Sequence, residues 1–330
     1  MEERLRDLQQ VMAAHREALA EARGAPNAGA ANPDAPDGRL LVLRRLARDI
    51  ERVSGIEITG IIEAKLARVL SSVDVAELAA WAGRLRLLPA NHPEWLSLIE
   101  ALTVHETFFH RDCAQLDLLA RILRETIATA AANGRCCLRL WSAGCATGEE
   151  AYTLAILALL ALRDAGFADE SREGGIVCRP PWQLDVLGTD ISRLVLTQAK
   201  NAVYATEGLS AFRDLPHELR RFFPILRRPG EAPATELRGV LATVSRHVRF
   251  RHFNLMAGSP PETGFDVVVC RNVLIYLTET ARGGAQLLLR EALRPGGHLL
   301  LGPTDALAEP AAYEPCWGAG AVAYALKPPR

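Results

Sequence analysis

The sequence lacks the cysteine pattern of a disulfide-stapled protein. Its seven cysteines are an odd number, and they show no paired short spacings. The region near Met1 also lacks the charged start, apolar core and small-residue cleavage site of a secretion signal. We therefore expect a protein of the reducing cytoplasm.

Long apolar runs are missing as well. The longest, residues 154–162, is far shorter than the ~20 residues that cross a bilayer. This run predicts a buried helix, and we expect no direct insertion into a membrane.

The chain has almost no net charge, with a formal value of −1 at pH 7. Its arginines are scattered and not gathered into a stripe with aromatic residues between them, so we expect no nucleic acid partner. No Cys/His spacing completes a metal site, so we also expect no bound metal.

The order of patterns along the chain predicts three parts. Residues 1–38 combine an amphipathic helical pattern over 1–22 with a linker over 24–38 rich in Ala, Gly, Pro and Asn. Residues 39–103 have helical patterns throughout and predict a domain of about four short helices. Breaks fall at Ser54, Ser71 and Asn91, and the expected helix starts are Asp74 and Pro93.

From residue 104 to 330, short apolar runs alternate with longer helical stretches, which predicts an α/β fold with a doubly wound parallel sheet. The candidate strands are 137–141, 184–188, 248–253, 265–270 and 298–302, with 321–326 as a late edge strand that could run antiparallel. The candidate helices are 149–162, 192–203 and 280–293. Residues 205–247 are too long for a normal connection and predict a small inserted subdomain.

A loop of small residues follows the first expected strand. Residues 141–150 (WSAGCATGEE) lead into a helix, where small side chains let the backbone approach a nucleotide-like ligand closely. A tight structural turn explains the same residues, because its two glutamates favour the positive end of the helix dipole. The loop alone leaves both interpretations open. Cys145 within it has no supporting His or Asp and is interpreted as packing.

Asp190 ends the second expected strand. A carboxylate there can accept hydrogen bonds from both ribose hydroxyls of an adenosine, at the edge where doubly wound sheets bind ligands. The alternative is a solvated aspartate that caps the next helix. Asp190 lies beyond the ~20-residue spacing of dinucleotide enzymes, and G-x-G-x-x-G is absent, so a nicotinamide cofactor is disfavoured.

Two further segments are rich in polar groups. Arg271 and Asn272 directly follow the apolar run 265–270, which favours a ligand site over simple strand termination. Residues 103–112 place polar and aromatic groups at the boundary between the expected domains, where clefts are common. For His105 and His110 alone, ordinary surface or hydrogen-bonded histidines are the simpler interpretation.

Together these segments resemble the chemotaxis receptor glutamate methyltransferases (CheR type) over residues 39–326. Four blocks carry the resemblance: 102–112, 140–152, 188–191 (GTDI) and 265–276 (FDVVVCRNVLIY). A Pro-Gly-Gly turn at 295–297 is also typical of class I methyltransferases. The resemblance implies a class I methyltransferase-like sheet, S-adenosylmethionine as cofactor, S-adenosylhomocysteine as product, and a chemoreceptor's helical cytoplasmic domain as protein substrate. We expect a monomer.

The resemblance also implies the site residues. The family's cofactor contacts fall on His105, Thr107, Arg111, Glu149, Asp190, Asn254, Leu255, Arg271 and Asn272. Family members use Arg111 and Tyr276 beside the methyl group, which implies a catalytic role for both. Because glutamate is ionised at neutral pH, methyl transfer to it needs positioning and water exclusion more than a strong base.

This chain departs from the family at some positions. The family often has asparagine where His105 stands, and receptor-binding members often carry a denser arginine row on the second helix than Lys65 and Arg68 provide. Residues 205–247 occupy the place of the family's small β-subdomain. Two alternatives stay open: a methyltransferase of another protein or small-molecule acceptor, and a non-catalytic regulatory module that binds S-adenosylmethionine. Intact Arg111, Asp190, Asn272 and Tyr276 argue against the second.

Overall fold

The computed structural model describes residues 36–207, 210–226 and 236–328. The helix predicted over 1–22 and most of the linker predicted over 24–38 lie outside these ranges. The chain divides into two compact units. The helical unit comprises the residues up to Val104 together with Tyr276–Ala281, and the α/β unit comprises the residues from His105 to Ile275 and from Arg282 onward.

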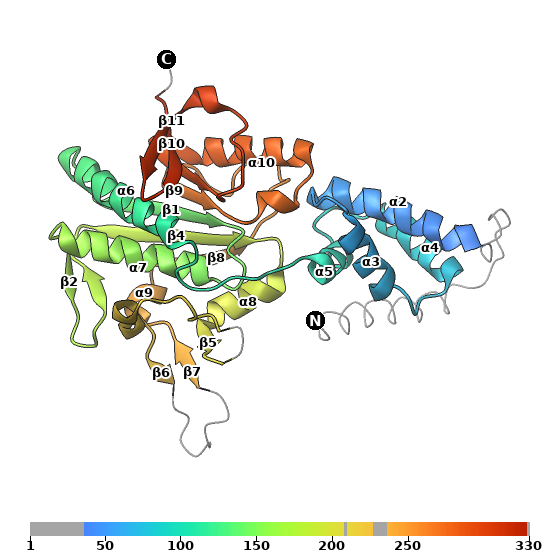
Figure 1. Ribbon diagram of the computed structural model, residues 1–330, viewed down its shortest axis with the longest axis horizontal. Helices are drawn as coiled ribbons and strands as arrows, with labels where there is room; N and C mark the ends of the chain where they lie inside the picture. The colour runs from blue at the N-terminus through green and yellow to red at the C-terminus, as the bar shows by residue number, and fades with distance from the viewer. Residues whose placement is uncertain (1–35, 208–209, 227–235, 329–330) are drawn as a thin grey trace. The chain divides into compact units, whose positions relative to one another are not determined.

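Residues 36–104 of the helical unit form four helices, and their ends follow the breaks in the sequence pattern. They are α2 (Pro36–Ser54), α3 (Gly60–Val69), α4 (Val75–Leu85) and α5 (Pro93–Leu102) (Figure 1). Asp74 caps α4 as predicted, because its Oδ1 accepts hydrogen bonds from the backbone N of Ala76 (2.9 Å) and Glu77 (3.2 Å). Trp81 and Trp95 are fully buried in the bundle, so packing stabilises helices that are short on their own.

A segment from far along the chain completes the helical unit. Ile56 and Leu277 form an antiparallel bridge. The backbone N of Glu57 donates to the carbonyl of Tyr276 (2.8 Å), and the N of Thr278 donates to the carbonyl of Gly55 (2.9 Å). The sequence pattern gave no sign of this return, because a pairing of distant backbone segments leaves no local periodicity.

A seven-stranded sheet forms the centre of the α/β unit, in the order β11-β12-β10-β9-β1-β4-β8. The neighbours from β10 to β8 pair in parallel, whereas β12 runs antiparallel to β10 and β11. The chain moves outward from β1 to β4 and β8, and then returns to the other side of β1 for β9 and β10. β1 therefore lies at the switch point of the sheet, where doubly wound folds bind ligands. The strands are β1 (Cys137–Ala143), β4 (Gln183–Asp190), β8 (Val248–His252), β9 (Phe265–Cys270), β10 (Leu293–Leu301), β11 (Tyr313–Gly318) and β12 (Ala321–Leu326).

All six predicted strands are present, including the antiparallel edge at 321–326, and the doubly wound α/β fold is confirmed. The start of β10 differs from the prediction. Leu293 already pairs with Phe265, and the register shifts before His298 pairs with Val267. The predicted turn at 294–297 is thus an irregularity inside a longer strand, with Gly296 in the left-handed region at φ 73°. Outside the segment of the predicted insert, three of the described strands were not predicted: β11 and the hairpin of β2 (Ala168–Glu170) and β3 (Ile176–Cys178).

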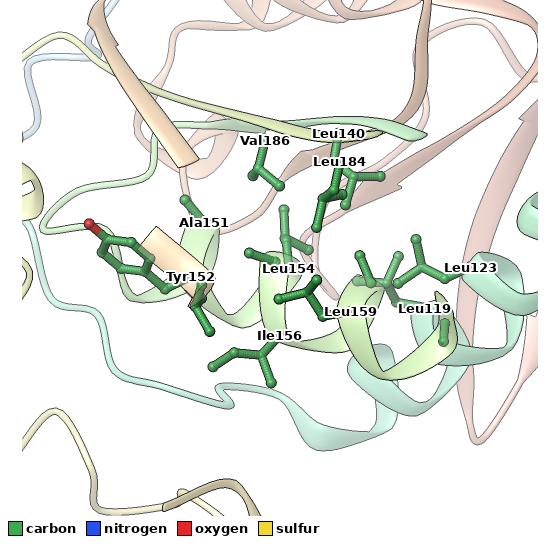
Figure 2. Packing of buried hydrophobic residues seen from close by; sticks show 14 of the residues in the cluster. Leu119, Leu123, Leu140, Ala151, Tyr152, Leu154, Ile156, Leu159, Leu184 and Val186 are labelled. Atoms are coloured by element: carbon green, nitrogen blue, oxygen red, sulfur yellow. The ribbon is translucent and has the colours of Figure 1, made fainter. Parts of the chain in front are cut away.

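Helices pack against the sheet, and α7 forms the centre of the core. Figure 2 shows Leu154 and Leu159 of α7 near Leu140 and Leu184 of the strands and near Leu119 of α6. The apolar run 154–162 is therefore a buried helix, as predicted. Among the described residues, no helix is both long and apolar enough to span a bilayer. The helices are α6 (Cys113–Ala132), α7 (Glu149–Asp164), α8 (Arg193–Asn201), α9 (Ala242–Ser245) and α10 (Glu279–Ala292), with short 3₁₀ helices η1 (His217–Phe222), η2 (Leu274–Tyr276) and η3 (Pro310–Ala312).

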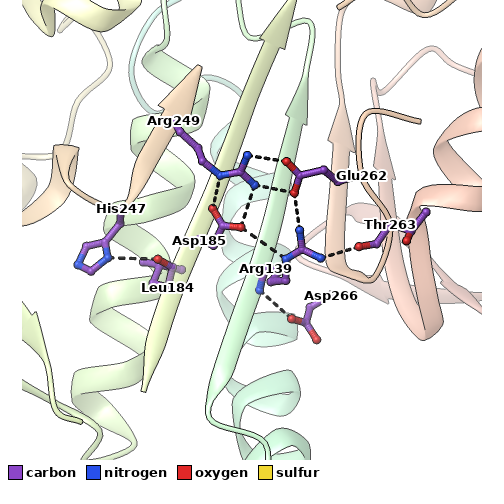
Figure 3. A network of polar contacts seen from close by, with 8 residues as sticks. All are labelled: Arg139, Leu184, Asp185, His247, Arg249, Glu262, Thr263 and Asp266. Carbon is purple, nitrogen blue, oxygen red and sulfur yellow. Dashed lines mark hydrogen bonds and ion pairs between the residues drawn. The ribbon is translucent and has the colours of Figure 1, made fainter. Parts of the chain in front are cut away.

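The opposite face of the sheet carries a network of charges beside buried apolar side chains such as Trp141 and Leu187. Arg139 and Asp185 alternate with residues buried against α7, so they point away from that helix. Arg249 bonds to Asp185 (2.7 Å) and to Glu262 (2.6 Å), and Arg139 bonds to Glu262 (2.5 Å) (Figure 3). Because each acid in this set has an arginine partner, the network belongs to the fold and not to the candidate site.

The predicted insert contains a small sheet of its own. Three short strands pair antiparallel in the order β5-β7-β6. They are β5 (Val203–Ala205), β6 (Ile225–Leu226) and β7 (Leu237–Gly239). Ser192 caps α8 through a hydrogen bond from Val195 N to its Oγ (3.4 Å), and Ala202 in the left-handed region ends that helix before β5 begins.

Candidate active site

The loop after β1 is pressed closely against its neighbours. The backbone N of Gly144 and that of Cys145 both donate to the carbonyl of Thr189, at 2.8 and 2.9 Å. Gly144 has φ 81°, and a Cβ added there would lie 2.3 Å from Cγ2 of Val273. Close packing between the ends of the strands thus requires a glycine at this position. The sequence alone left open whether the small residues of the loop serve a ligand or a tight turn, and Gly144 at least is required by packing.

Asp190 joins the loops that follow β1 and β4. It is only 7% exposed. Its Oδ2 accepts a hydrogen bond from Ala146 N and its Oδ1 accepts one from Ser192 N, both at 2.9 Å. The alternative of a solvated helix cap is therefore wrong, since Asp190 is buried and Ser192 caps α8. The side chain of His105 also lies here, with Nε2 3.7 Å from Asp190 Oδ1.

Glu149 places a second buried carboxyl group at the same edge, in the first turn of α7. It is 3% exposed, and its Oε2 accepts a hydrogen bond from the Thr147 hydroxyl (2.6 Å). Burial raises the pKa of Glu149 to about 7, only partly opposed by this hydrogen bond. A cation bound beside it would favour the ionised form and lower this pKa.

Arg271 ties three segments together at the end of β9. Its side chain is 2% exposed. Nη2 donates to the carbonyl of Arg111 (2.6 Å) and to Oδ2 of Asp112 (2.9 Å), while Nη1 lies 3.7 Å from Oε2 of Glu150. Glu150 also accepts a hydrogen bond from the Ser142 hydroxyl (2.7 Å). Burial raises the pKa of Glu150, and Arg271 opposes that shift.

Sequence reasoning missed Asp112, Ser142 and Glu150 as part of this arrangement. One signal was available for Glu150. Consecutive residues on an α-helix point about 100° apart, so Glu149 and Glu150 cannot have the same surroundings, and two roles could have been expected. No local pattern linked Asp112 to Arg271.

The segment that carries Arg111 is held by residues of the insert. The ring of Phe109 lies 5.1 Å from that of Phe212 and 4.4 Å from that of Phe223, and the N of Phe109 donates to the carbonyl of Ala211 (2.8 Å). The insert therefore supports the candidate site directly.

Arg111 and a second arginine flank the same aromatic ring. Arg111 Nη1 donates to the carbonyl of Glu106 (2.8 Å), and its guanidinium lies 5.6 Å from the centre of the Phe108 ring. Arg213 lies over that ring at 3.8 Å and bonds to the carboxylate of Glu106 (2.9 Å). Thr107 is partly buried in the same segment.

The remaining candidates lie after the neighbouring strands. Asn254 follows β8, and its Oδ1 accepts a hydrogen bond from Met256 N (2.9 Å) in a local turn that includes the partly buried Leu255. Asn272 follows β9 in the left-handed region, at φ 58°. Because parallel strands end at one edge, these residues share that edge with Glu149 and Asp190. Tyr276 belongs to the helical unit instead, and the residue is 40% exposed.

Neither a thiol nucleophile nor a metal centre is found at this edge. Cys145 is buried, and burial raises the pKa of its thiol well above the ordinary value, so the thiolate that a nucleophile needs is disfavoured. Within the described ranges, no group of three or more His, Cys, Asp or Glu is arranged to hold a metal ion.

Comparison with known proteins agrees with this geometry. A family model described as CheR methyltransferase, SAM binding domain, matches residues 105–319. Chemotaxis protein methyltransferase 1 of Pseudomonas aeruginosa is 33% identical over 212 residues, which are 64% of this chain and 69% of that protein. Chemotaxis protein methyltransferase Cher2 of Pseudomonas putida is 30% identical over 212 residues, with the same shares.

A third relative is much longer than this chain. It is an uncharacterized 104.1 kDa protein of Rhodobacter capsulatus, 33% identical over 255 residues that are 76% of this chain but 23% of that protein. The family model, however, matches well over half of the chain, from the segment of His105 to β11. The chain therefore belongs to the CheR methyltransferase family, and its α/β unit is an S-adenosylmethionine-binding methyltransferase domain.

Proposed function

We propose that this methyltransferase esterifies glutamate side chains on the helical cytoplasmic domain of a chemoreceptor. One observation carries the proposal furthest: Arg271, at the ligand edge of the sheet, donates to the main-chain carbonyl of Arg111 (2.6 Å). This contact ties the partly buried Arg111 to the edge where we propose that the methyl donor binds. A guanidinium there suits an acceptor that is a carboxylate.

The residues at the edge fit S-adenosylmethionine chemically. This cofactor carries a sulfonium and an ammonium group, and Glu149 offers a buried carboxyl group whose ionised form a cation would stabilise. Asp190 is a buried carboxylate whose two oxygens both accept backbone N–H groups, and a carboxylate at this edge can also accept hydrogen bonds from ribose hydroxyls. The proposed cofactor contacts are His105, Thr107, Arg111, Glu149, Asp190, Asn254, Leu255, Arg271 and Asn272.

The chain's own part in the reaction is to position the acceptor and exclude water. Bound S-adenosylmethionine would supply an electrophilic methyl group to a glutamate carboxylate and would leave as S-adenosylhomocysteine. Arg111 holds that carboxylate by charge-assisted hydrogen bonds, and Tyr276 fixes its second oxygen or lines the methyl donor. No general base is needed, since glutamate is ionised at neutral pH.

The test is transfer of a labelled methyl group from S-adenosylmethionine to receptor cytoplasmic fragments. We expect label on glutamate that mild base releases as methanol. Arg111→Ala should lower the rate by about 10²-fold or more, in the range seen for removal of one electrostatic contact to a reacting group. Arg172→Ala, which removes an exposed arginine outside the site, is the control. An active Arg111→Ala variant would remove the proposed role of Arg111.

One observation favours the alternative of a different acceptor. Lys65 is one of the two basic residues that were compared with the denser arginine row of receptor-binding members, and its ammonium donates to the carbonyls of Leu102 (3.1 Å) and Thr103 (3.3 Å) at the end of α5. A base-stable methyl product, or transfer only to small molecules, would support that alternative.

We further propose that the enzyme acts as a monomer in the cytoplasm, without nucleic acid.

A further inference from the structure

Two residues with a left-handed backbone flank Arg111 in the chain. His110 has φ 62° and Asp112 has φ 59°, a region that residues with a side chain seldom adopt. Among the described residues other than glycine, six have a positive φ, and two of these, Ala202 and Ala319, end a helix and turn a hairpin. The other four lie in segments of the candidate site: His110, Asp112, Ala146 and Asn272. A strained backbone that is concentrated at one site requires contacts that hold it there.

The side chain of Asp112 does not play the usual role of an aspartate at the start of a helix. Asp112 is the N-cap residue of α6, but its side chain makes no capping hydrogen bond. Asp74, in contrast, caps α4 with its side chain. The Oδ2 of Asp112 accepts a hydrogen bond from Nη2 of Arg271 instead (2.9 Å). The carboxylate is therefore used to hold Arg271 and not to begin α6.

The same nitrogen of Arg271 also holds the main chain of Arg111. Nη2 carries two N–H groups, and it donates to the carbonyl of Arg111 (2.6 Å) as well as to Asp112. The side chain of Arg271 is 2% exposed, so both hydrogen bonds are shielded from water. Because the guanidinium is planar and its donors point in fixed directions, its two acceptors orient it together. Loss of the Asp112 carboxylate would remove one of them.

A second carboxylate orients Arg271 through its other terminal nitrogen. Nη1 of Arg271 lies 3.7 Å from Oε2 of Glu150, in the first turn of α7. Glu150 is held in turn by Ser142 of β1, whose hydroxyl donates to its Oε1 (2.7 Å). Arg271 therefore links the segment of Arg111 to the ends of β1 and α7, where we propose that the cofactor binds.

The chain before Arg111 is held by separate contacts. The N of Phe109 donates to the carbonyl of Ala211 (2.8 Å), and the N of His110 donates to the hydroxyl of Thr153 on α7 (3.4 Å). The main chain is thus fixed on both sides of Arg111. On the later side, the described contacts from other segments all come from Arg271, which Asp112 orients.

Stability alone does not account for the use of Asp112. Arg271 is buried and needs a counter-charge, but Glu150 already provides one. The side chain of Asp112 is 35% exposed, and ion pairs that are open to water contribute little to stability. The left-handed backbone at Asp112 opposes folding further.

We propose that Asp112 is a positioning residue for methyl transfer, which acts through Arg271 to hold the main chain of Arg111 at the edge of the sheet. This inference rests on the proposed function, because it assigns Asp112 a part in the role proposed for Arg111. Asp112 does not need to contact either substrate in this role.

The experiment compares the wild-type full chain with two variants of Asp112. Asp112→Asn removes the charge, and Asp112→Gly removes the side chain but suits a left-handed backbone. Asp164→Asn is the control, because Asp164 forms an exposed ion pair with Arg163 (2.7 Å) in the same unit. Initial rates of methyl transfer to receptor fragments, at varied concentrations of both substrates, give kcat and KM. Urea denaturation establishes that each variant is folded.

Both Asp112 variants should lower kcat about tenfold, since a misplacement of about 1 Å can cost as much as 10²-fold and Arg271 keeps its bond to the carbonyl of Arg111. The KM for the receptor fragment should stay within about threefold, because one carboxylate is a small part of a protein substrate. The control should match the wild type. A wild-type kcat in Asp112→Gly would overturn the proposal. So would a rate that recovers fully at saturating S-adenosylmethionine, which would make Asp112 a determinant of cofactor affinity instead.

A double variant tests whether Asp112 acts through Arg111. Once Arg111→Ala has removed the guanidinium, the addition of Asp112→Asn should lower the rate by less than about twofold. A general structural role of Asp112 would lower the rate by the same factor in either background. An equal loss in the two backgrounds would therefore overturn the proposal.

Hydrogen exchange distinguishes this proposal from the proposed function, because it needs no methyl acceptor. Peptides that span residues 105–116 should exchange faster in Asp112→Asn than in the wild type, and Asp164→Asn should leave them unchanged. Faster exchange in Asp112→Asn, together with no methylation of glutamate by the wild type, would contradict the proposed function and leave Asp112 as the residue that holds this segment. Unchanged exchange and an unchanged rate in Asp112→Asn would contradict the positioning role alone.

Discussion

Glu149 and Asp190 are two buried carboxyl groups in different surroundings. Asp190 accepts hydrogen bonds from two backbone N–H groups, which compensate the charge of a carboxylate that is largely buried. Glu149 receives one hydroxyl, and its pKa rises to about 7. The sequence could identify both positions from their places at strand and helix ends, but not the raised pKa of Glu149, because its burial depends on the packing of segments far apart in the sequence.

The raised pKa of Glu149 makes cofactor binding depend on pH. In the ligand-free protein, neutral Glu149 favours folding at low pH, and this stability is lost as the pH rises through about 7. A cationic ligand needs the ionised form, so the affinity for S-adenosylmethionine should rise about fivefold from about pH 6 to about pH 7. Titration calorimetry across this range checks the prediction. Glu149→Gln should show a flat profile, and an unchanged slope in that variant would assign the effect to another group.

Gly144 allows the loop after β1 to approach Val273. A Cβ at Gly144 would meet Val273 Cγ2 at 2.3 Å in a left-handed backbone, so Gly144→Ala should lower the free energy of unfolding by about 2–5 kcal/mol. Gly134→Ala is a matched control, because Gly134 also has a positive φ but open space around it; it should cost about 1–2 kcal/mol. Urea denaturation of both variants checks this difference. Equal losses would mean that the close packing against Val273 is unimportant.

At the scale of elements, the candidate site depends on contacts that no local pattern encodes. The motif over 103–112 was found from its polar and aromatic composition. Its support comes from the insert through Phe212 and Arg213, and from β9 through Arg271. Strands with strong apolar runs were predictable from the sequence, because an apolar run is a local signal. The irregular start of β10 and the short hairpin of β2 and β3 carry too few residues to give such a signal.

Arg213 should matter for activity more than for stability. Its ion pair with Glu106 is partly exposed, so Arg213→Ala should change the free energy of unfolding by less than about 1 kcal/mol. The loss of its contacts with Phe108 and Glu106 should loosen the segment of Arg111 and lower the methyl transfer rate several-fold. Arg221→Ala, which breaks a comparable ion pair with Glu170, should leave the rate unchanged. Initial rates and denaturation curves for both variants are the measurements. Similar rates for the two variants would exclude a positioning role for Arg213.

At the scale of the whole molecule, the described chain forms two compact units, and a short segment of the second half of the sequence belongs to the first unit. Composition and periodicity separated a helical part from an α/β part. They could not assign 276–281, because the antiparallel bridge between Ile56 and Leu277 joins positions far apart in the sequence.

The cofactor should stabilise the two units unequally. All proposed cofactor contacts lie in the α/β unit, so S-adenosylmethionine at about 100 times its dissociation constant should stabilise that unit by about 2.7 kcal/mol. Hydrogen exchange followed by mass spectrometry should show slower exchange in β1, β4 and α7, with α3 and α4 unchanged. If exchange slowed in α3 and α4 as much as in β1, β4 and α7, the prediction that the cofactor stabilises mainly the α/β unit would be wrong.

The central claim is that the carboxyl edge around Asp190 holds the cofactor. Its most direct test is calorimetric titration with S-adenosylmethionine and, separately, S-adenosylhomocysteine, on the wild type and on Asp190→Asn. Asp169→Asn, an exposed carboxylate in β2, is the control. We predict saturable binding of both compounds by the wild type and the control, and at least about tenfold weaker binding by folded Asp190→Asn, as expected for the loss of a charge-assisted contact. Equal affinities for the wild type and Asp190→Asn would contradict the account.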